Sequence, residues 1–157
     1  MKEIALIGTN GRVMSAVLSK LLQKGLYVNL LSLNPERVML ENTQLTVTRF
    51  NVSSPDAIRD NLEGYSTLVI ANETDLENET LDNLILKSFP TTLAAAHKAG
   101  AKRIIVVGAK ESNAFYTGHL KRFNDIDWVY FDTEGNFAEY VADEIVNPKY
   151  HKENASF

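Results

Sequence analysis

The residues best suited to chemistry lie near the start of the chain, at Gly8-Thr9-Asn10-Gly11-Arg12-Val13-Met14. The apolar run Ile4-Ala5-Leu6-Ile7 precedes this segment, and a helical pattern follows it as far as Gly25. A glycine-rich turn between a buried strand and a helix directs backbone N–H groups and the positive end of the helix dipole toward an anion. The pattern Gly-x-x-Gly-x-x-Met therefore predicts a nucleotide-binding turn whose third glycine is replaced by Met14.

Met14 leaves two interpretations of this turn open. In a dinucleotide site the first glycine makes the turn, the second lets the backbone approach the pyrophosphate, and the third lets the helix pack closely on the strand. Gly8 and Gly11 can fill the first two roles, but a thioether at position 14 must either fill space against the strand or extend toward the phosphate. The turn therefore either binds a dinucleotide or keeps the fold and binds nothing.

Alternating strands and helices must position this turn. Apolar and β-branched runs predict strands at residues 2–7, 27–32, 46–50, 67–71, 103–107 and 127–131. Apolar residues at helical spacing predict helices up to Gly25 and at residues 55–62, 81–99 and 137–146, with a short helical piece at 36–40. Pro90 should kink or split the helix at 81–99. Residues 111–124 show no clear period, and the tail to Phe157 is polar.

This alternation predicts an α/β fold with one doubly wound parallel sheet, because strand–helix–strand crossovers join parallel neighbours. In the dinucleotide-binding version the strand order is 3-2-1-4-5-6, and the ligand lies across the carboxyl ends of strands 1 and 4. The Gly8 turn would lie at that crevice.

The bulk composition narrows the function classes. The 157 residues suit a single domain, and a net charge of −4 argues against nucleic acid or an anionic membrane as the main partner. The absence of cysteine excludes disulfides and thiolate metal ligands, and we expect no metal site. The chain starts directly in a strand, and no apolar run approaches the ~18 residues of a membrane span. We therefore expect one cytoplasmic domain over residues 1–157.

Several further segments carry a family resemblance: Asn34-Pro35-Glu36-Arg37, Asn51-Val52-Ser53-Ser54-Pro55-Asp56, Ala99-Gly100-Ala101-Lys102-Arg103, Val106-Val107-Gly108 and Asp127-Trp128. With the Gly8 turn, their order and spacing resemble those of the atypical short-chain dehydrogenases/reductases of the NAD(P)H-binding type, the NADH-flavin reductase and NmrA-like branch. The resemblance implies a Rossmann-like NAD(P)-binding fold. The stretch between Phe131 and Phe137 is nearly absent here, where these relatives place a substrate-side insertion.

The resemblance also implies a set of cofactor-binding residues, namely Gly8, Thr9, Asn10, Gly11, Arg12, Val13, Met14, Ser32, Asn34, Asn51, Val52, Ala71, Asn72, Val107 and Gly108. The cofactor would be NADP or NAD. No acid follows strand 2, where an NAD site usually has one, which favours NADP slightly. Leu33 stands where the family often has a basic residue, and Asn51 replaces its aspartate beside the adenine pocket.

The catalytic pattern Tyr-x-x-x-Lys of the wider superfamily is not present, because Leu120 lies four residues after Tyr116 and Lys121 comes one position late. The resemblance implies instead hydride transfer from the cofactor to a flavin or quinone-like acceptor over Ala71, Asn72, Val107 and Gly108, without a protein acid. The alternative is a non-catalytic module, either a nucleotide-sensing regulator of the NmrA type or an oligomerising protein. Met14, Leu33, Asn51 and the short C-terminal half favour this alternative, and the last strand and final helix could form a homodimer surface.

Overall fold

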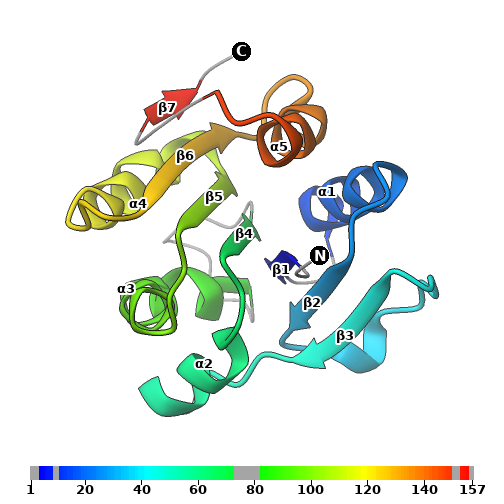
Figure 1. Ribbon diagram of the computed structural model, residues 1–157, viewed down its shortest axis with the longest axis horizontal. Helices are drawn as coiled ribbons and strands as arrows, with labels where there is room; N and C mark the ends of the chain where they lie inside the picture. The colour runs from blue at the N-terminus through cyan, green and yellow to red at the C-terminus, as the bar shows by residue number, and fades with distance from the viewer. Residues whose placement is uncertain (1–3, 9–10, 73–81, 150–152, 156–157) are drawn as a thin grey trace.

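Seven parallel strands form the sheet of the computed structural model, which describes residues 4–8, 11–72, 82–149 and 153–155 (Figure 1). The strands are β1 (Ile4–Gly8), β2 (Val28–Ser32), β3 (Leu45–Arg49), β4 (Thr67–Asn72), β5 (Arg103–Gly108), β6 (Asp127–Asp132) and β7 (Glu153–Ala155). Their order in the sheet is β3-β2-β1-β4-β5-β6-β7. The predicted order of strands 1 to 6, and with it the doubly wound α/β fold, is confirmed.

The helices cover the sheet in two layers. They are α1 (Arg12–Gln23), α2 (Pro55–Leu62), α3 (Asp82–Lys98), α4 (Asn113–Leu120) and α5 (Phe137–Val146), with 3₁₀ turns η1 (Pro35–Arg37) and η2 (Lys110–Ser112). Helices α1 and α5 pack on each other over one face, and α2, α3 and α4 cover the other (Figure 1). Each face of the sheet is therefore buried, which explains why β1, β4 and β5 contain runs of consecutive apolar residues.

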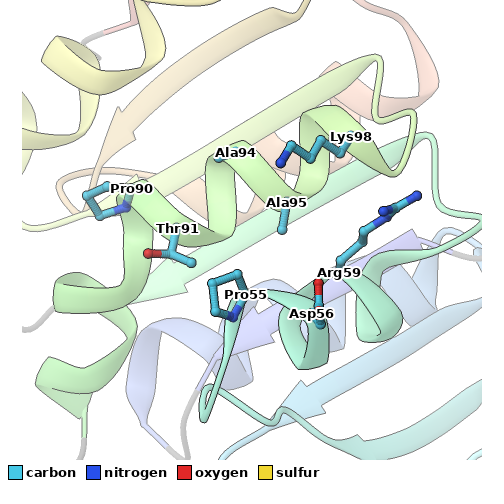
Figure 2. Close-up of a pocket in the computed structure, with 8 residues that line it drawn as sticks. All are labelled: Pro55, Asp56, Arg59, Pro90, Thr91, Ala94, Ala95 and Lys98. Atoms are coloured by element: carbon cyan, nitrogen blue, oxygen red, sulfur yellow. The ribbon is translucent and has the colours of Figure 1, made fainter.

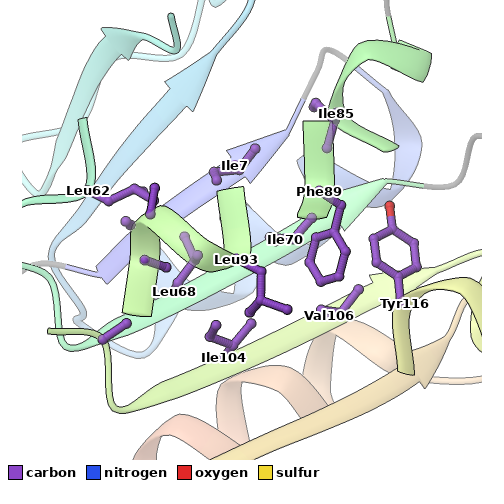
Figure 3. Close-up of a cluster of buried hydrophobic side chains, with 14 of the residues drawn as sticks. Ile7, Leu62, Leu68, Ile70, Ile85, Phe89, Leu93, Ile104, Val106 and Tyr116 are labelled. Carbon is purple, nitrogen blue, oxygen red and sulfur yellow. The ribbon is translucent and has the colours of Figure 1, made fainter. Parts of the chain in front are cut away.

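Two hydrophobic cores result from the strand pleat. In β1, Leu6 faces the core under α1 and α5, and Ile7 faces the core under α2, α3 and α4. Figure 3 shows the second core, where Phe89 and Leu93 of α3 meet Ile70, Ile104 and Val106 of the sheet. Trp128 of β6 also lies in this core and is 2% exposed.

Most element predictions are confirmed to within a few residues, but helix α4, the short turn η2 before it and strand β7 were not predicted. Helix α4 lies in the segment without a clear period, because its buried face includes Thr117, whose hydroxyl donates to the carbonyl of Asn113. The polar tail contributes β7, which pairs with β6 from Val129↔Glu153 to Phe131↔Ala155. Since β7 covers the edge of β6, the last strand predicted from the sequence is not an exposed edge.

The proline inside α3 bends the helix without dividing it. Residues Asp82–Lys98 form one helix, and Figure 2 shows it changing direction at Pro90. Pro90 lacks the N–H that would continue the hydrogen-bond ladder, and a kink is the usual outcome. Of the two outcomes predicted, the kink is the correct one.

Candidate functional site

The carboxyl ends of the strands bring several predicted site residues to one edge of the sheet. Gly8 is in register with Ser32 of β2 and with Ala71 of β4. Asn72 is in register with Gly108 of β5. The turn after β1, the end of β2 and the ends of β4 and β5 therefore share one edge, which is where ligands bind in open parallel sheets.

Met14 and Gly8 form one packing unit at the start of this edge. The Met14 side chain is 5% exposed and belongs to the core under α1 and α5. A Cβ added to Gly8 would lie 2.5 Å from Met14 Cγ and 3.2 Å from the carbonyl oxygen of Ala71. Met14 thus fills the space beside Gly8, which is the first of the two roles that the sequence left open.

Among the described residues, no side chain caps the start of α1. Gly11 is the N-cap residue, and it offers no side-chain acceptor to the first-turn N–H groups. The first turn contains no acidic residue either, and Arg12 is its first residue. Helix α2 differs, since the Ser54 hydroxyl accepts a hydrogen bond from Ala57 N–H at 3.1 Å. Because first-turn N–H groups have no acceptor within their own helix, the start of α1 has the polarity that a pyrophosphate requires.

Arg12 is positioned by the neighbouring helix. Its guanidinium carbon lies 5.8 Å from the centre of the Phe137 ring at the start of α5. The same residues line a hollow of about 530 Å³ between the starts of α1 and α5. This contact with the aromatic ring restrains the guanidinium at the start of α1.

A turn follows β2, and its residues have distinct roles. Ser32 is fully buried, and its hydroxyl accepts the N–H of Asn34 at 3.0 Å. Leu33 packs against the core under α2 and α3, while its carbonyl accepts a hydrogen bond from Arg49 Nη1 at 3.1 Å. The second guanidinium nitrogen of Arg49 lies 2.9 Å from the Glu36 carboxylate. This ion pair was missed by the sequence reasoning, although Arg49 lies within the predicted strand 46–50 beside the end of β2.

Asn51 and Val52 lie after β3, toward the outer end of the same edge. The side-chain oxygen of Asn51 accepts the N–H of Ser53 at 2.9 Å, and Val52 packs against the core. The side-chain carbonyl of Asn51 therefore accepts a hydrogen bond within the turn. Its NH₂ group is a donor, whereas the aspartate that the family resemblance implies at this position would be an acceptor.

Two tyrosines close the sheet edge at β5. A Cβ on Gly108 would lie 2.6 Å from the Tyr130 hydroxyl oxygen and 3.2 Å from Tyr116 Cε2. The Tyr130 hydroxyl donates to the carbonyl of Ala109, and the Tyr116 ring stacks edge-on against Phe89 with 4.7 Å between centroids. Gly108 is therefore a glycine because the tyrosines occupy the volume of a side chain.

Neither tyrosine is an accessible acid. Both side chains are fully buried, and this burial raises the pKa of each phenol. Lys121 follows the end of α4 and is exposed, whereas Tyr116 is buried. These two residues therefore do not form the catalytic Tyr–Lys pair of the wider superfamily. The His119 ring packs against Phe115 with 5.0 Å between the ring centres.

The hollows between α2 and α3 lie on the outer helix layer and not among the ends of β1, β4 and β5. One of about 340 Å³ is lined by residues from both helices, including Arg59, Ala95 and Lys98 (Figure 2). A second, of about 310 Å³, shares Pro55 and Thr91 with it and reaches Val52. The second hollow therefore reaches Val52, one of the cofactor-binding residues that the family resemblance implies.

The structure thus places Gly8, Ser32, Ala71, Asn72, Val107 and Gly108 together, with Gly11 to Met14 at the adjoining helix start. Thr9 and Asn10 lie outside the described residues. Asp132 also ends its strand in register with Gly108 and was not predicted as a site residue. Within the described ranges, no three His, Asp or Glu side chains could together hold a metal ion, and no helix is long and apolar enough to cross a membrane.

Residues 8–147 match the NAD(P)H-binding family. The chain belongs to this family. The matched range starts at the Gly8 turn and ends after α5, so it includes every strand end described above except that of β7. No curated protein matches the chain.

Solved structures share the fold at low sequence identity. A proposed epimerase from Bacteroides thetaiotaomicron has a TM-score of 0.80 at 24% identity, covering 99% of this chain and 95% of its own. An oxidoreductase from Lactococcus lactis has a TM-score of 0.79 at 15% identity, covering 98% and 89%. Triphenylmethane reductase from Citrobacter, solved with NADP(H), has a TM-score of 0.71 at 16% identity, covering 97% and 68%. At these identities the likeness shows the fold alone.

Proposed function

We propose that the protein binds NAD(P)H across the ends of β1 and β4 and that hydride passes to a flavin or quinone-like acceptor over the ends of β4 and β5. The observation that carries the proposal is the uncapped, acid-free start of α1 directly after Gly8. Membership of the NAD(P)H-binding family supports it.

The residues of this chain divide the work of binding. The first-turn N–H groups of α1 and the guanidinium of Arg12 would hold the pyrophosphate, and the turn at Asn34 would lie beside the adenosine ribose. When bound, the reduced nicotinamide supplies a hydride, which carries two electrons and one proton. Ala71, Asn72, Val107 and Gly108 would line the place where the acceptor receives it.

The second proton of the reduced acceptor would come from solvent. Tyr116 and Tyr130 are the phenols beside the strand ends, and their burial and raised pKa make them poor donors. A flavin or a quinone stabilises the negative charge that hydride addition creates, so it needs no acid in the hydride step. A simple carbonyl does need one, because an alkoxide would otherwise form.

The same buried tyrosines favour the second candidate, a nucleotide sensor that performs no reduction. In that case a dinucleotide would bind at the same edge without an acceptor. A homodimer would involve α5 and not β6, because β7 covers the edge of β6.

Binding is tested by the melting temperature with and without NADPH, NADH and FMN at millimolar concentration. A ligand at about 100 times its dissociation constant adds about 2.7 kcal/mol to the free energy of unfolding. Because each kcal/mol raises the melting temperature of a domain this size by about 2–4 °C, we expect one of the dinucleotides to raise it by about 5–11 °C. If none of the three ligands shifts it, both the reductase and the sensor proposals fail.

Catalysis is tested by following NAD(P)H oxidation at 340 nm with FMN or a soluble quinone as the acceptor. We expect oxidation that depends on both the enzyme and the acceptor, with a simple ketone as an inactive control. Dinucleotide binding without oxidation in the presence of either acceptor would favour the sensor.

A further inference from the structure

Arg49 places a cation at the end of β2, where the sequence shows only Ser32, Leu33 and Asn34. It is the last residue of β3 and is in register with Ser32. From there its side chain extends back over the turn that follows β2, where Nη1 bonds the carbonyl of Leu33 at 3.1 Å. In doubly wound dinucleotide-binding sheets the adenosine ribose lies beside this turn, and a nearby arginine accommodates a 2′-phosphate.

We propose that Arg49 binds the 2′-phosphate of NADP(H) and so makes the site prefer NADP(H) over NAD(H). This inference rests on the proposed function, because it assigns a residue of the same dinucleotide site. A neighbouring strand thus supplies the charge that Leu33 cannot.

The hydrogen bonds of the guanidinium leave it able to bind a phosphate. A guanidinium has five N–H donors, and the bonds to Leu33 and Glu36 engage its two terminal nitrogens with one donor each. The bond to the Leu33 carbonyl fixes the plane of the group at the turn. The remaining N–H groups can form the paired hydrogen bonds that arginine makes with phosphate oxygens.

Glu36 is the competitor for this cation. Its carboxylate lies 2.9 Å from Arg49 Nη2, and the two side chains are 60% and 61% exposed. An exposed ion pair of this kind is weak, so a phosphate dianion can share or take the guanidinium. Glu36 should therefore lower the affinity for NADP(H), and its removal should raise it. Arg37, the next residue of η1, adds a second exposed positive charge to the same turn.

The experiment measures dissociation constants for NADPH, NADH, 2′,5′-ADP and 5′-AMP by calorimetry on the full chain. We expect the native protein to bind NADPH at least about tenfold more tightly than NADH, and 2′,5′-ADP at least about tenfold more tightly than 5′-AMP. A ratio of this size is typical of a hydrogen bond to a charged group. Arg49→Gln should remove most of this ratio and leave NADH binding unchanged. Glu36→Gln should strengthen NADPH binding severalfold with little effect on NADH.

Arg59→Gln is the matched control, because Arg59 is an exposed arginine that lines the hollow between α2 and α3, away from the end of β2. It should leave all four dissociation constants unchanged. The NADPH preference should also shrink as salt is raised from 50 to 500 mM, because added ions screen the phosphate–guanidinium attraction.

The inference is overturned if NADH binds as tightly as NADPH, or if Arg49→Gln weakens both dinucleotides equally. A loss of NADH affinity in Glu36→Gln would also contradict it, since Glu36 would then bind the ribose hydroxyls. These results leave the proposed function intact. If neither dinucleotide binds the native protein, it is the proposed function that fails.

Discussion

At the scale of single residues, Gly8 and Gly108 show why a glycine in this fold is not by itself evidence of a ligand. Each lies at a strand end, and in each case a large side chain of this protein occupies the volume that a Cβ would need. Met14 fills the space at Gly8, and Tyr116 with Tyr130 fills it at Gly108. The replaced third glycine of the turn is therefore compensated by packing, and the anion binding that we propose depends on the start of α1 instead.

Met14→Gly tests this packing. The change removes a side chain that is 95% buried between α1 and the sheet, and it places a glycine inside a helix. We expect the free energy of unfolding to fall by about 3–6 kcal/mol, of which truncation of a buried side chain accounts for about 2–5 and the helical glycine for about 1. Urea unfolding followed by circular dichroism measures the change.

Met14→Leu is the control for that substitution, because it keeps most of the buried volume and should cost less than about 1.5 kcal/mol. If Met14→Gly were instead as stable as the native protein and bound NADPH more tightly, Met14 would be an obstruction in the phosphate site. The packing at Gly8 argues for the first result.

At the scale of elements, a buried ion pair joins α5 to the sheet. Glu144 of α5 is 1% exposed at its side chain and pairs with Arg103 at the start of β5, whose side chain is 11% exposed. The other carboxylate oxygen of Glu144 accepts the N–H of Lys149 at 2.9 Å. Burial lowers the pKa of Arg103, and the charge of Asp127 opposes this. One carboxylate therefore connects α5, β5 and the segment that leads to β7.

Glu144→Gln should be strongly destabilising, because it leaves a buried guanidinium without its counter-charge. Breaking such a pair costs about 3–5 kcal/mol, whereas replacing both partners with apolar residues is often neutral. We therefore expect the double variant Arg103→Met, Glu144→Leu to recover much of the loss in urea unfolding. If Glu144→Gln unfolds at the native urea midpoint, the pair does not hold α5 on the sheet.

The elements themselves were predictable wherever one periodicity dominated. The apolar runs inside β4 and β5 and the capped start of α2 are local signals that the tertiary structure does not override. Helix α4 was missed because a buried threonine and a glycine, Thr117 and Gly118, weaken its apolar stripe. Strand β7 was missed because the edge of β6, and not its own composition, makes it a strand.

At the scale of the whole molecule, the sequence located the candidate site through topology. Once the strand order was predicted, Gly8, Asn72 and Gly108 had to share one edge. Arg49 was not predictable in the same way, because its role depends on how its long side chain reaches back across β2 to Leu33 and Glu36. Side-chain direction at a strand end is a tertiary property, and strand assignment alone does not supply it.

The two faces of the sheet also carry surface ion pairs that connect elements and respond to acid. A hydrogen bond with His97 lowers the pKa of Asp125, joining the end of α3 to the segment before β6. A hydrogen bond with Lys20 lowers the pKa of Glu139, joining α1 to α5. Because both pKa values are lower in the folded protein, the folded state binds fewer protons than the unfolded state in acid. Each pair therefore stabilises the folded protein fully above the ordinary pKa of its carboxyl group, 3.8 for Asp125 and 4.5 for Glu139. This stabilisation is lost as the pH falls through the lower pKa of the folded state.

We expect the urea midpoint to fall as the pH is lowered from about 5 to 3, and the double variant Asp125→Asn, Glu139→Gln to show a shallower fall. The effect should be modest, since water screens exposed pairs. The control is Glu41→Gln, Asp60→Asn, which removes two exposed carboxylates that form no ion pair among the described residues. If the urea midpoint of the Asp125→Asn, Glu139→Gln variant fell with pH as steeply as that of the native protein, the two pairs would not contribute to the acid dependence of stability.

If both double variants reduced this slope equally, the cause would be the change in net charge, because only the first variant removes hydrogen bonds between elements.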